Sequence, residues 1–272
     1  MKKRIFAATM AATLAVLIAS ASTALAAPSW APASSATIHP GVQVFTNGAQ
    51  CTSNFVFYDA SNVYLGQAAH CSSTSDNTAT NGCDTKSLPL GTAVNVTGAS
   101  KPGTLVYNSW IAMQNAHETD ANTCAYNDLA LIKIDPADVA KVNPSIPFWG
   151  GPTGIASTTT QGETVLSYGN SELRGGVEQL SPKQGESLGA SAGGWTHQVL
   201  TVTPGIPGDS GSAFINEAGK AFGVLSTLEV APLPASNGVG DLSRELSYAA
   251  GHGAAVTLAT GTEPFSGRLL PI

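Results

Sequence analysis

The chain has 272 residues, of which 11% are charged, and its formal net charge is -6 at neutral pH. This balance provides no basic surface for nucleic acids or anionic membranes, so it excludes proteins that bind such partners through positive charge. The 29 glycines and 16 prolines indicate many turns and short strands, which favours an all-β protein.

The first residues have the pattern of a secretory signal peptide. Three basic residues at positions 2–4 precede an apolar run over 5–18, and Ala24-Leu25-Ala26 provide the small residues of a cleavage site. A membrane anchor is the alternative, but the apolar run is short for a bilayer, and small and Pro-rich residues follow it. We therefore predict a signal peptide at residues 1–26, a short leader or disordered segment at 27–37, and a protein secreted to the extracellular space.

Apolar and alternating segments predict the strands of the first half of the chain. Residues 55–58 and 63–65 flank the turn-forming residues 59–62, which indicates a β-hairpin that ends shortly before His70. Further strands are expected at 93–97, 104–107 and 129–134.

A segment rich in proline and glycine, residues 142–152, interrupts this pattern and predicts a linker between residues 38–141 and residues 153–272. Beyond the linker, strands are expected at 163–169, 198–202 and 221–226. Asp241 precedes apolar residues at helical spacing, so it is expected to cap a late helix. Periodicity alone thus predicts a mostly β chain with one helix near its end.

Three short motifs together predict a catalytic serine. In chain order they are Ala68-Ala69-His70-Cys71, Asn127-Asp128-Leu129-Ala130-Leu131 and Gly208-Asp209-Ser210-Gly211-Ser212. A serine hydroxyl is a poor nucleophile, so acyl transfer needs a base that takes its proton. It also needs a third group that orients this base and stabilises the cation it becomes. Each motif alone is common turn or cap chemistry, whereas the ordered set provides all three roles in His70, Asp128 and Ser210.

In these motifs the chain resembles secreted bacterial serine proteases of the chymotrypsin/trypsin family, over roughly residues 41–250. Subtilisins and α/β-hydrolases carry their triads in other orders. The resemblance implies two antiparallel six-stranded β-barrels with the active site in the cleft between them, plus the C-terminal helix. It also implies a serine endopeptidase that acts on protein or peptide substrates through an acyl-enzyme, as a monomer and without a cofactor or metal.

The resemblance further assigns roles around the triad. The backbone N–H groups of Gly208 and Ser210 are expected to bind the oxyanion of the tetrahedral intermediate. Ser226 matches a position that contacts the catalytic aspartate. Asp209 is expected to pair with a buried cation, either a freed amino terminus or an internal arginine, because an unpaired buried carboxylate is costly. Arg174 and Arg244 are the internal candidates.

The residues of the expected substrate pocket depart from the trypsin pattern. Pro204 stands where trypsin-like enzymes carry the aspartate that selects Lys or Arg, and Ile206 replaces a nearby cysteine. Thr227 and Leu228 occupy the segment that lines the pocket, and Leu228 would narrow it. We therefore expect a preference for small or medium apolar residues.

Gln67 also departs from the family motif, which usually has Thr or Ser before the histidine motif. Two alternatives to a peptidase therefore remain open. One is a catalytically silent secreted homologue that acts as a binding module through the same cleft. The other is an esterase that uses the same triad, because acyl-enzyme chemistry handles both kinds of bond.

Four cysteines in an exported protein predict two disulfides, for which the sequence alone permits three connectivities. The family resemblance selects Cys51 with Cys71, which leaves Cys83 with Cys124. A zinc site of Cys51, Cys71 and His70 is a weaker alternative, because the paired-cysteine spacing of such sites is missing. No chemistry is assigned to the other histidines, His39, His117, His197 and His252.

Overall fold

The computed structural model describes residues 26–75, 80–228 and 234–267. Apart from Ala26, the predicted signal peptide lies outside these residues. None of the helices in the described ranges combines the length and apolar character that crossing a bilayer requires.

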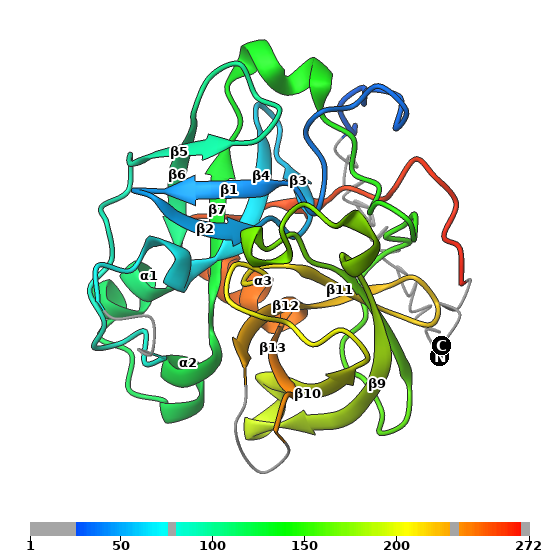
Figure 1. Cartoon of the computed structure of the whole chain (residues 1–272). Helices are drawn as coiled ribbons and strands as arrows, with labels where there is room; N and C mark the ends of the chain where they lie inside the picture. Colours follow the sequence, from blue (N-terminus) through cyan, green and yellow to red (C-terminus); the bar gives the residue numbers. More distant parts are fainter. Residues whose placement is uncertain (1–25, 76–79, 229–233, 268–272) are drawn as a thin grey trace, which may run out of the picture.

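An antiparallel sheet fills the upper part of the molecule in Figure 1. Its strand order is β14-β3-β4-β7-β6-β5-β1-β2. The strands are β1 (Gln43–Thr46), β2 (Ala49–Thr52), β3 (Val56–Tyr58), β4 (Val63–Ala68), β5 (Ala93–Val96), β6 (Gly103–Asn108), β7 (Leu129–Lys133) and β14 (Thr257–Leu258). The central strand β4 is buried along its whole length, whereas β5 alternates exposed and buried residues, as expected of a strand with one face in solvent.

A closed barrel of six antiparallel strands forms the lower part. Its strand order is β10-β13-β12-β11-β8-β9. The strands are β8 (Thr164–Tyr168), β9 (Pro182–Ser191), β10 (Thr196–Thr201), β11 (Ala213–Asn216), β12 (Ala221–Leu228) and β13 (Asn237–Asp241). Phe214, Phe222, Val199 and Val239 fill part of its interior.

The predicted all-β class, the six-stranded second barrel and the C-terminal helix are confirmed. The first half differs in its strand count, because the described sheet has eight strands and β14 comes from the end of the chain. The two halves also share a core, since Leu65 and Leu131 of the sheet belong to the same buried apolar cluster as Ile215 and Val224 of the barrel.

Helix α3 (Leu242–Gly251) begins where the sequence predicts, and the carboxylate of Asp241 accepts the N–H of Arg244 at 2.8 Å. Two further helices were not predicted, α1 (Ser109–Ala116) and α2 (Ala121–Tyr126). Asn108 and Asp120 cap them through their side chains, so a cap signal precedes each. Short 3-10 helices are η1 (Ala69–Ser72), η2 (Pro136–Lys141), η3 (Glu172–Arg174), η4 (Glu178–Leu180) and η5 (Ala192–Gly194).

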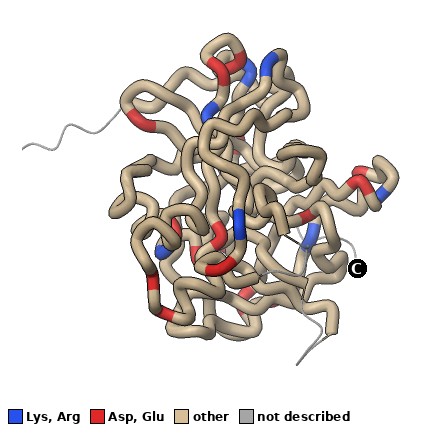
Figure 2. The backbone as a smooth tube through the Cα atoms, turned by 90° about the vertical axis from the view of Figure 1, so that its left-hand side faces the viewer, with Lys and Arg blue, Asp and Glu red and all other residues tan. Residues whose placement is uncertain are grey.

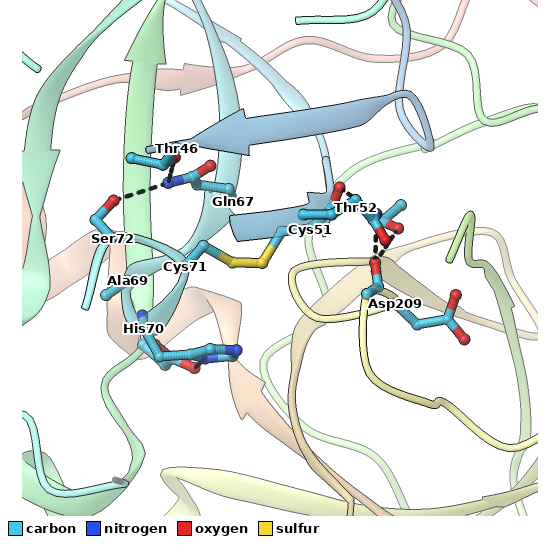
Figure 3. The surroundings of a disulfide bond; sticks show 12 residues. Thr46, Cys51, Thr52, Gln67, Ala69, His70, Cys71, Ser72 and Asp209 are labelled. Carbon is cyan, nitrogen blue, oxygen red and sulfur yellow. Dashed lines mark hydrogen bonds and ion pairs between the residues drawn. A yellow bond between two sulfur atoms is a disulfide. The ribbon is translucent and has the colours of Figure 1, made fainter. Parts of the chain in front are cut away.

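Both disulfides implied by the family resemblance are present, Cys51–Cys71 and Cys83–Cys124. The first ties β2 to η1, which carries His70, as Figure 3 shows. Cys51, His70 and Cys71 lie close enough to hold a metal ion, but the two sulfurs are bonded to each other and are not free thiolates. This geometry argues against the zinc alternative.

Charged residues are dispersed over the molecule. In Figure 2, the positions of Lys and Arg along the backbone are interspersed with those of Asp and Glu.

Candidate active site

The pairing of β4 with β7 brings His70 and Asp128 together. Ala68 at the end of β4 faces Leu129 at the start of β7, so the residues just beyond these strand ends become neighbours. Asp128 Oδ2 lies 2.7 Å from His70 Nδ1, and Asp128 Oδ1 accepts the backbone N–H of His70 at 2.9 Å. Both carboxylate oxygens therefore fix the histidine, its ring through one and its backbone through the other.

The surroundings of the pair favour a protonated imidazole. Burial by itself lowers the pKa of His70, but the charge of Asp128 and its hydrogen bond outweigh burial and raise that pKa above the ordinary value. The hydroxyl of Ser226, on β12, donates to Asp128 Oδ2 at 2.5 Å, so the barrel also holds the carboxylate. The arrangement can stabilise the cation that His70 becomes when it accepts a proton.

Ser210 lines the same cleft as His70 and Asp128, a hollow of about 480 Å³. Among the described residues, the hydroxyl of Ser210 makes no hydrogen bond to the imidazole. Catalytic hydrogen bonds are often long without substrate and tighten when substrate binds. A larger hollow of about 820 Å³ is lined by residues such as His39 and Trp149 and includes none of these three.

The loop before Ser210 presents two unused backbone donors. Pro207 O accepts the hydroxyl of Ser171 at 2.6 Å, and Asp209 O accepts the N–H of Ser212 at 3.0 Å. The N–H of a trans peptide points away from its carbonyl, so these bonds also fix the N–H groups of Gly208 and Ser210. Within the described chain neither N–H has a hydrogen-bond partner, which leaves both available to an oxyanion.

Gly208 has a φ of +92°, which glycine adopts far more readily than other residues. Its carbonyl accepts hydrogen bonds from Gln50 Nε2 at 2.9 Å and from Thr52 Oγ1 at 2.8 Å, both on β2. A Cβ at this position would lie 2.2 Å from Gln50 Oε1. The sheet therefore fixes the shape of a loop that belongs to the barrel, and Figure 3 shows Thr52 beside this loop.

Asp209 lies in a buried cluster with two cations. Its Oδ2 is 2.5 Å from Arg174 and 2.9 Å from Lys183 Nζ, while Oδ1 accepts the N–H of Ser171 at 3.0 Å. The side chains of Asp209 and Lys183 are 0% exposed and that of Arg174 is 9% exposed. Burial raises the pKa of Asp209, but the two cations and their hydrogen bonds outweigh it and leave the pKa below its ordinary value.

Of the two arginines expected as partners of Asp209, the structure therefore selects Arg174. Arg244 instead lies over the ring of Trp195, 5.8 Å from its centroid. Lys183 was missed because it lies on β9, a strand that was not predicted, and because a lysine side chain is rarely fully buried. Burial lowers the pKa of Lys183, and the adjacent Asp209 opposes that change.

The expected pocket residues are only partly brought together. Thr227 and Leu228 line the cleft, whereas Pro204 does not, and its carbonyl accepts a hydrogen bond from Arg174 at 3.1 Å. Asn237, which the sequence analysis missed, accepts the N–H of Gly205 at 2.8 Å and donates to Thr227 O at 3.1 Å. Its amide joins two walls of the cleft.

Among the histidines outside the cleft, His197 is buried. It lies 2.8 Å from Asp241 Oδ2 and 2.9 Å from Thr159 Oγ1, inside the barrel and apart from the cleft. No chemistry is assigned to this histidine, and its environment fits a structural role.

Solved structures with a similar fold are bacterial serine proteases. Protease A of Thermobifida fusca aligns with a TM-score of 0.53 at 18% identity, over 82% of this chain and 99% of that one. A glutamic acid-specific serine protease, which uses a histidine triad in substrate binding, aligns with a TM-score of 0.52 at 17% identity, over 82% of this chain and 100% of that one. No protein-family profile and no curated protein sequence matches the chain. At this level of identity the likeness establishes the fold.

Proposed function

The chain has the fold of the bacterial chymotrypsin-like serine proteases, and from this premise we propose that it is a secreted serine endopeptidase with His70, Asp128 and Ser210 as its triad. The observation that carries the proposal is the two-point contact between Asp128 and His70 in a cleft that Ser210 also lines. The two disulfides fit an oxidising extracellular environment. We further propose that the enzyme acts as a monomer.

The mechanism follows from these positions. As the Ser210 hydroxyl attacks the substrate carbonyl, His70 Nε2 takes its proton and later gives that proton to the leaving amine. Asp128 holds the tautomer of His70 that leaves Nε2 free to accept. The N–H groups of Gly208 and Ser210 bind the oxyanion, and one such donor is typically worth about a hundredfold or more in rate. Water then hydrolyses the acyl-enzyme by the same steps.

A fluorophosphonate probe tests the nucleophile. Such a probe forms a covalent bond only with an activated serine, so we expect stoichiometric labelling of the exported chain and none of Ser210→Ala. Ser247→Ala removes a hydroxyl from the exposed side of α3 and serves as a control that labels normally. A folded wild-type chain that resists the probe would instead favour the silent binding module, and turnover of esters without peptides would favour an esterase.

Substrate selection is predicted from the walls of the cleft. Thr227 and Leu228 line it, and its described lining contains no Lys, Arg or Glu side chain. We expect cleavage after small or medium apolar residues in a random peptide library, and cuts dominated by charged residues would contradict this. Leu228→Gly removes a side chain that is 47% exposed and should raise kcat/KM for aromatic over alanine substrates by roughly tenfold.

A further inference from the structure

Helix α3 places an acidic side chain directly behind the proposed catalytic aspartate. Glu245 is 0% exposed, and its Oε1 accepts the backbone N–H of Asp128 at 2.9 Å. With Asp241 as the cap, Glu245 lies on the same buried side of the helix as Leu242 and Ala249. The helix follows the barrel in the chain but packs against β7 as well as β12 and β13, and Figure 1 shows it between the two halves.

The groups that face Glu245 include no cation in the described chain. They are Asp128 before β7, Asp241 at the end of β13 and Tyr107 on β6. Burial raises the pKa of Glu245 well above its ordinary value, the charges of Asp128 and Asp241 act in the same direction, and the N–H of Asp128 only partly opposes them. On balance these influences favour the uncharged form of the carboxyl over its anion.

An uncharged carboxyl suits this position for two reasons. It still accepts a hydrogen bond, so the buried N–H of Asp128 is satisfied. It also adds no second negative charge beside Asp128, so the charge that acts on His70 remains that of one carboxylate. Tyr107, whose hydroxyl is buried and has no hydrogen-bond partner in the described structure, is a further polar group near Glu245.

We propose that Glu245 is a positioning residue, which holds the backbone of Asp128 in the geometry where its carboxylate binds both the ring and the backbone of His70. The inference rests on the proposed triad, because Glu245 acts on the reaction only through Asp128 and His70. It assigns to the C-terminal helix a function in setting the geometry of two residues of the first half.

Two substitutions of Glu245 test separately its role as a hydrogen-bond acceptor and the effect of its charge. Glu245→Gln keeps an oxygen that can accept the Asp128 N–H and is uncharged at every pH. Glu245→Leu has a similar size and no acceptor. Glu186→Gln removes one charge from an exposed position on β9 and is the matched control.

We expect kcat of Glu245→Leu to fall by about tenfold, with KM within about twofold of wild type, because a lost buried hydrogen bond disturbs the triad and not the substrate pocket. Glu245→Gln should restore kcat to within about twofold of wild type, and Glu186→Gln should match wild type. The pKa of His70, followed by NMR through its ring signals, should be the same in wild type and Glu245→Gln, because the proposed role of Glu245 is that of an uncharged acceptor.

Equal kcat in the leucine variant and wild type would overturn the inference, as would an equal loss in the leucine and glutamine variants. A His70 pKa that falls by about one unit in Glu245→Gln would show that the glutamate is charged, and would also overturn it. If the leucine variant does not fold, kcat and the His70 titration of the glutamine variant decide alone. If wild type has no Ser210-dependent activity, the proposed function fails, while the titration still tests the link from Glu245 to His70.

Discussion

Asp128→Asn is expected to lower kcat by about ten-thousand-fold while the chain stays folded. The amide of asparagine can donate where the carboxylate only accepts, so the ring of His70 is no longer held in the tautomer that accepts the Ser210 proton. Loss of the negative charge also removes the main influence that raises the pKa of His70. Steady-state kinetics on a peptide substrate, measured from acidic to alkaline pH, would show both effects.

The same substitution should also shift the pH dependence of activity, in a direction set by the pKa of His70. General-base catalysis needs neutral His70, so wild-type activity falls as the pH drops through the raised pKa of the histidine. In Asp128→Asn the residual activity should fall at a lower pH than in wild type. Ser226→Ala is the partner variant, because it removes one hydrogen bond to Asp128 but no charge, and it should cost no more than about tenfold. If Asp128→Asn cost no more than Ser226→Ala, His70 would not depend on the carboxylate.

Asp209→Asn is expected to lower the free energy of unfolding by about 3–5 kcal/mol. The substitution leaves Arg174 and Lys183 buried beside each other without the carboxylate that lies 2.5 and 2.9 Å from them. Removal of one cation as well, in Asp209→Asn with Lys183→Met, should recover part of the loss. Chemical denaturation with the disulfides intact, followed by tryptophan fluorescence, would measure both variants.

An exposed ion pair provides the control for this cluster. Lys101 lies 3.8 Å from Asp135 with its side chain 60% exposed, so Lys101→Met should cost less than about 1 kcal/mol. A cost of Asp209→Asn no larger than that of Lys101→Met would contradict the prediction. In wild type the pKa of Asp209 lies below its ordinary value of 3.8, so its stabilisation is complete above that value and is lost as the pH falls through the lower folded-state pKa.

The three residues of the proposed triad could be predicted from the sequence because each lies in a short motif. His70 follows a strand, Asp128 precedes one, and Ser210 lies in a glycine-rich turn, so local pattern and chain order identify them. The residues that hold them could not be predicted in this way. Lys183 and Glu245 are both buried polar side chains that lie in a strand and a helix without any motif, and only the tertiary fold brings them to Asp209 and Asp128.

The limits on predicting the fold have a similar cause. Strands β8, β10 and β12 and helix α3 have apolar patterns or a cap that predict them, and the structure contains them, whereas β9, β11 and β13 were not predicted. Helix α1 buries few of its residues, chiefly Trp110 and Met113, so its apolar periodicity is weak although Asn108 marks its start. Strand β14 is two residues long, and its pairing depends on where the chain goes after α3.

That last pairing makes the completion of the first sheet depend on a segment that follows the barrel in the chain. Thr257 and Leu258 pair with Tyr58 and Phe57, and the N–H of Ala259 donates to Val56 O, so β14 covers the outer side of β3. Until β14 pairs with it, β3 is an apolar strand with unpaired backbone groups on one side, which invites pairing with another chain. This edge of the first sheet is therefore protected only after the segment that follows α3 has docked onto it.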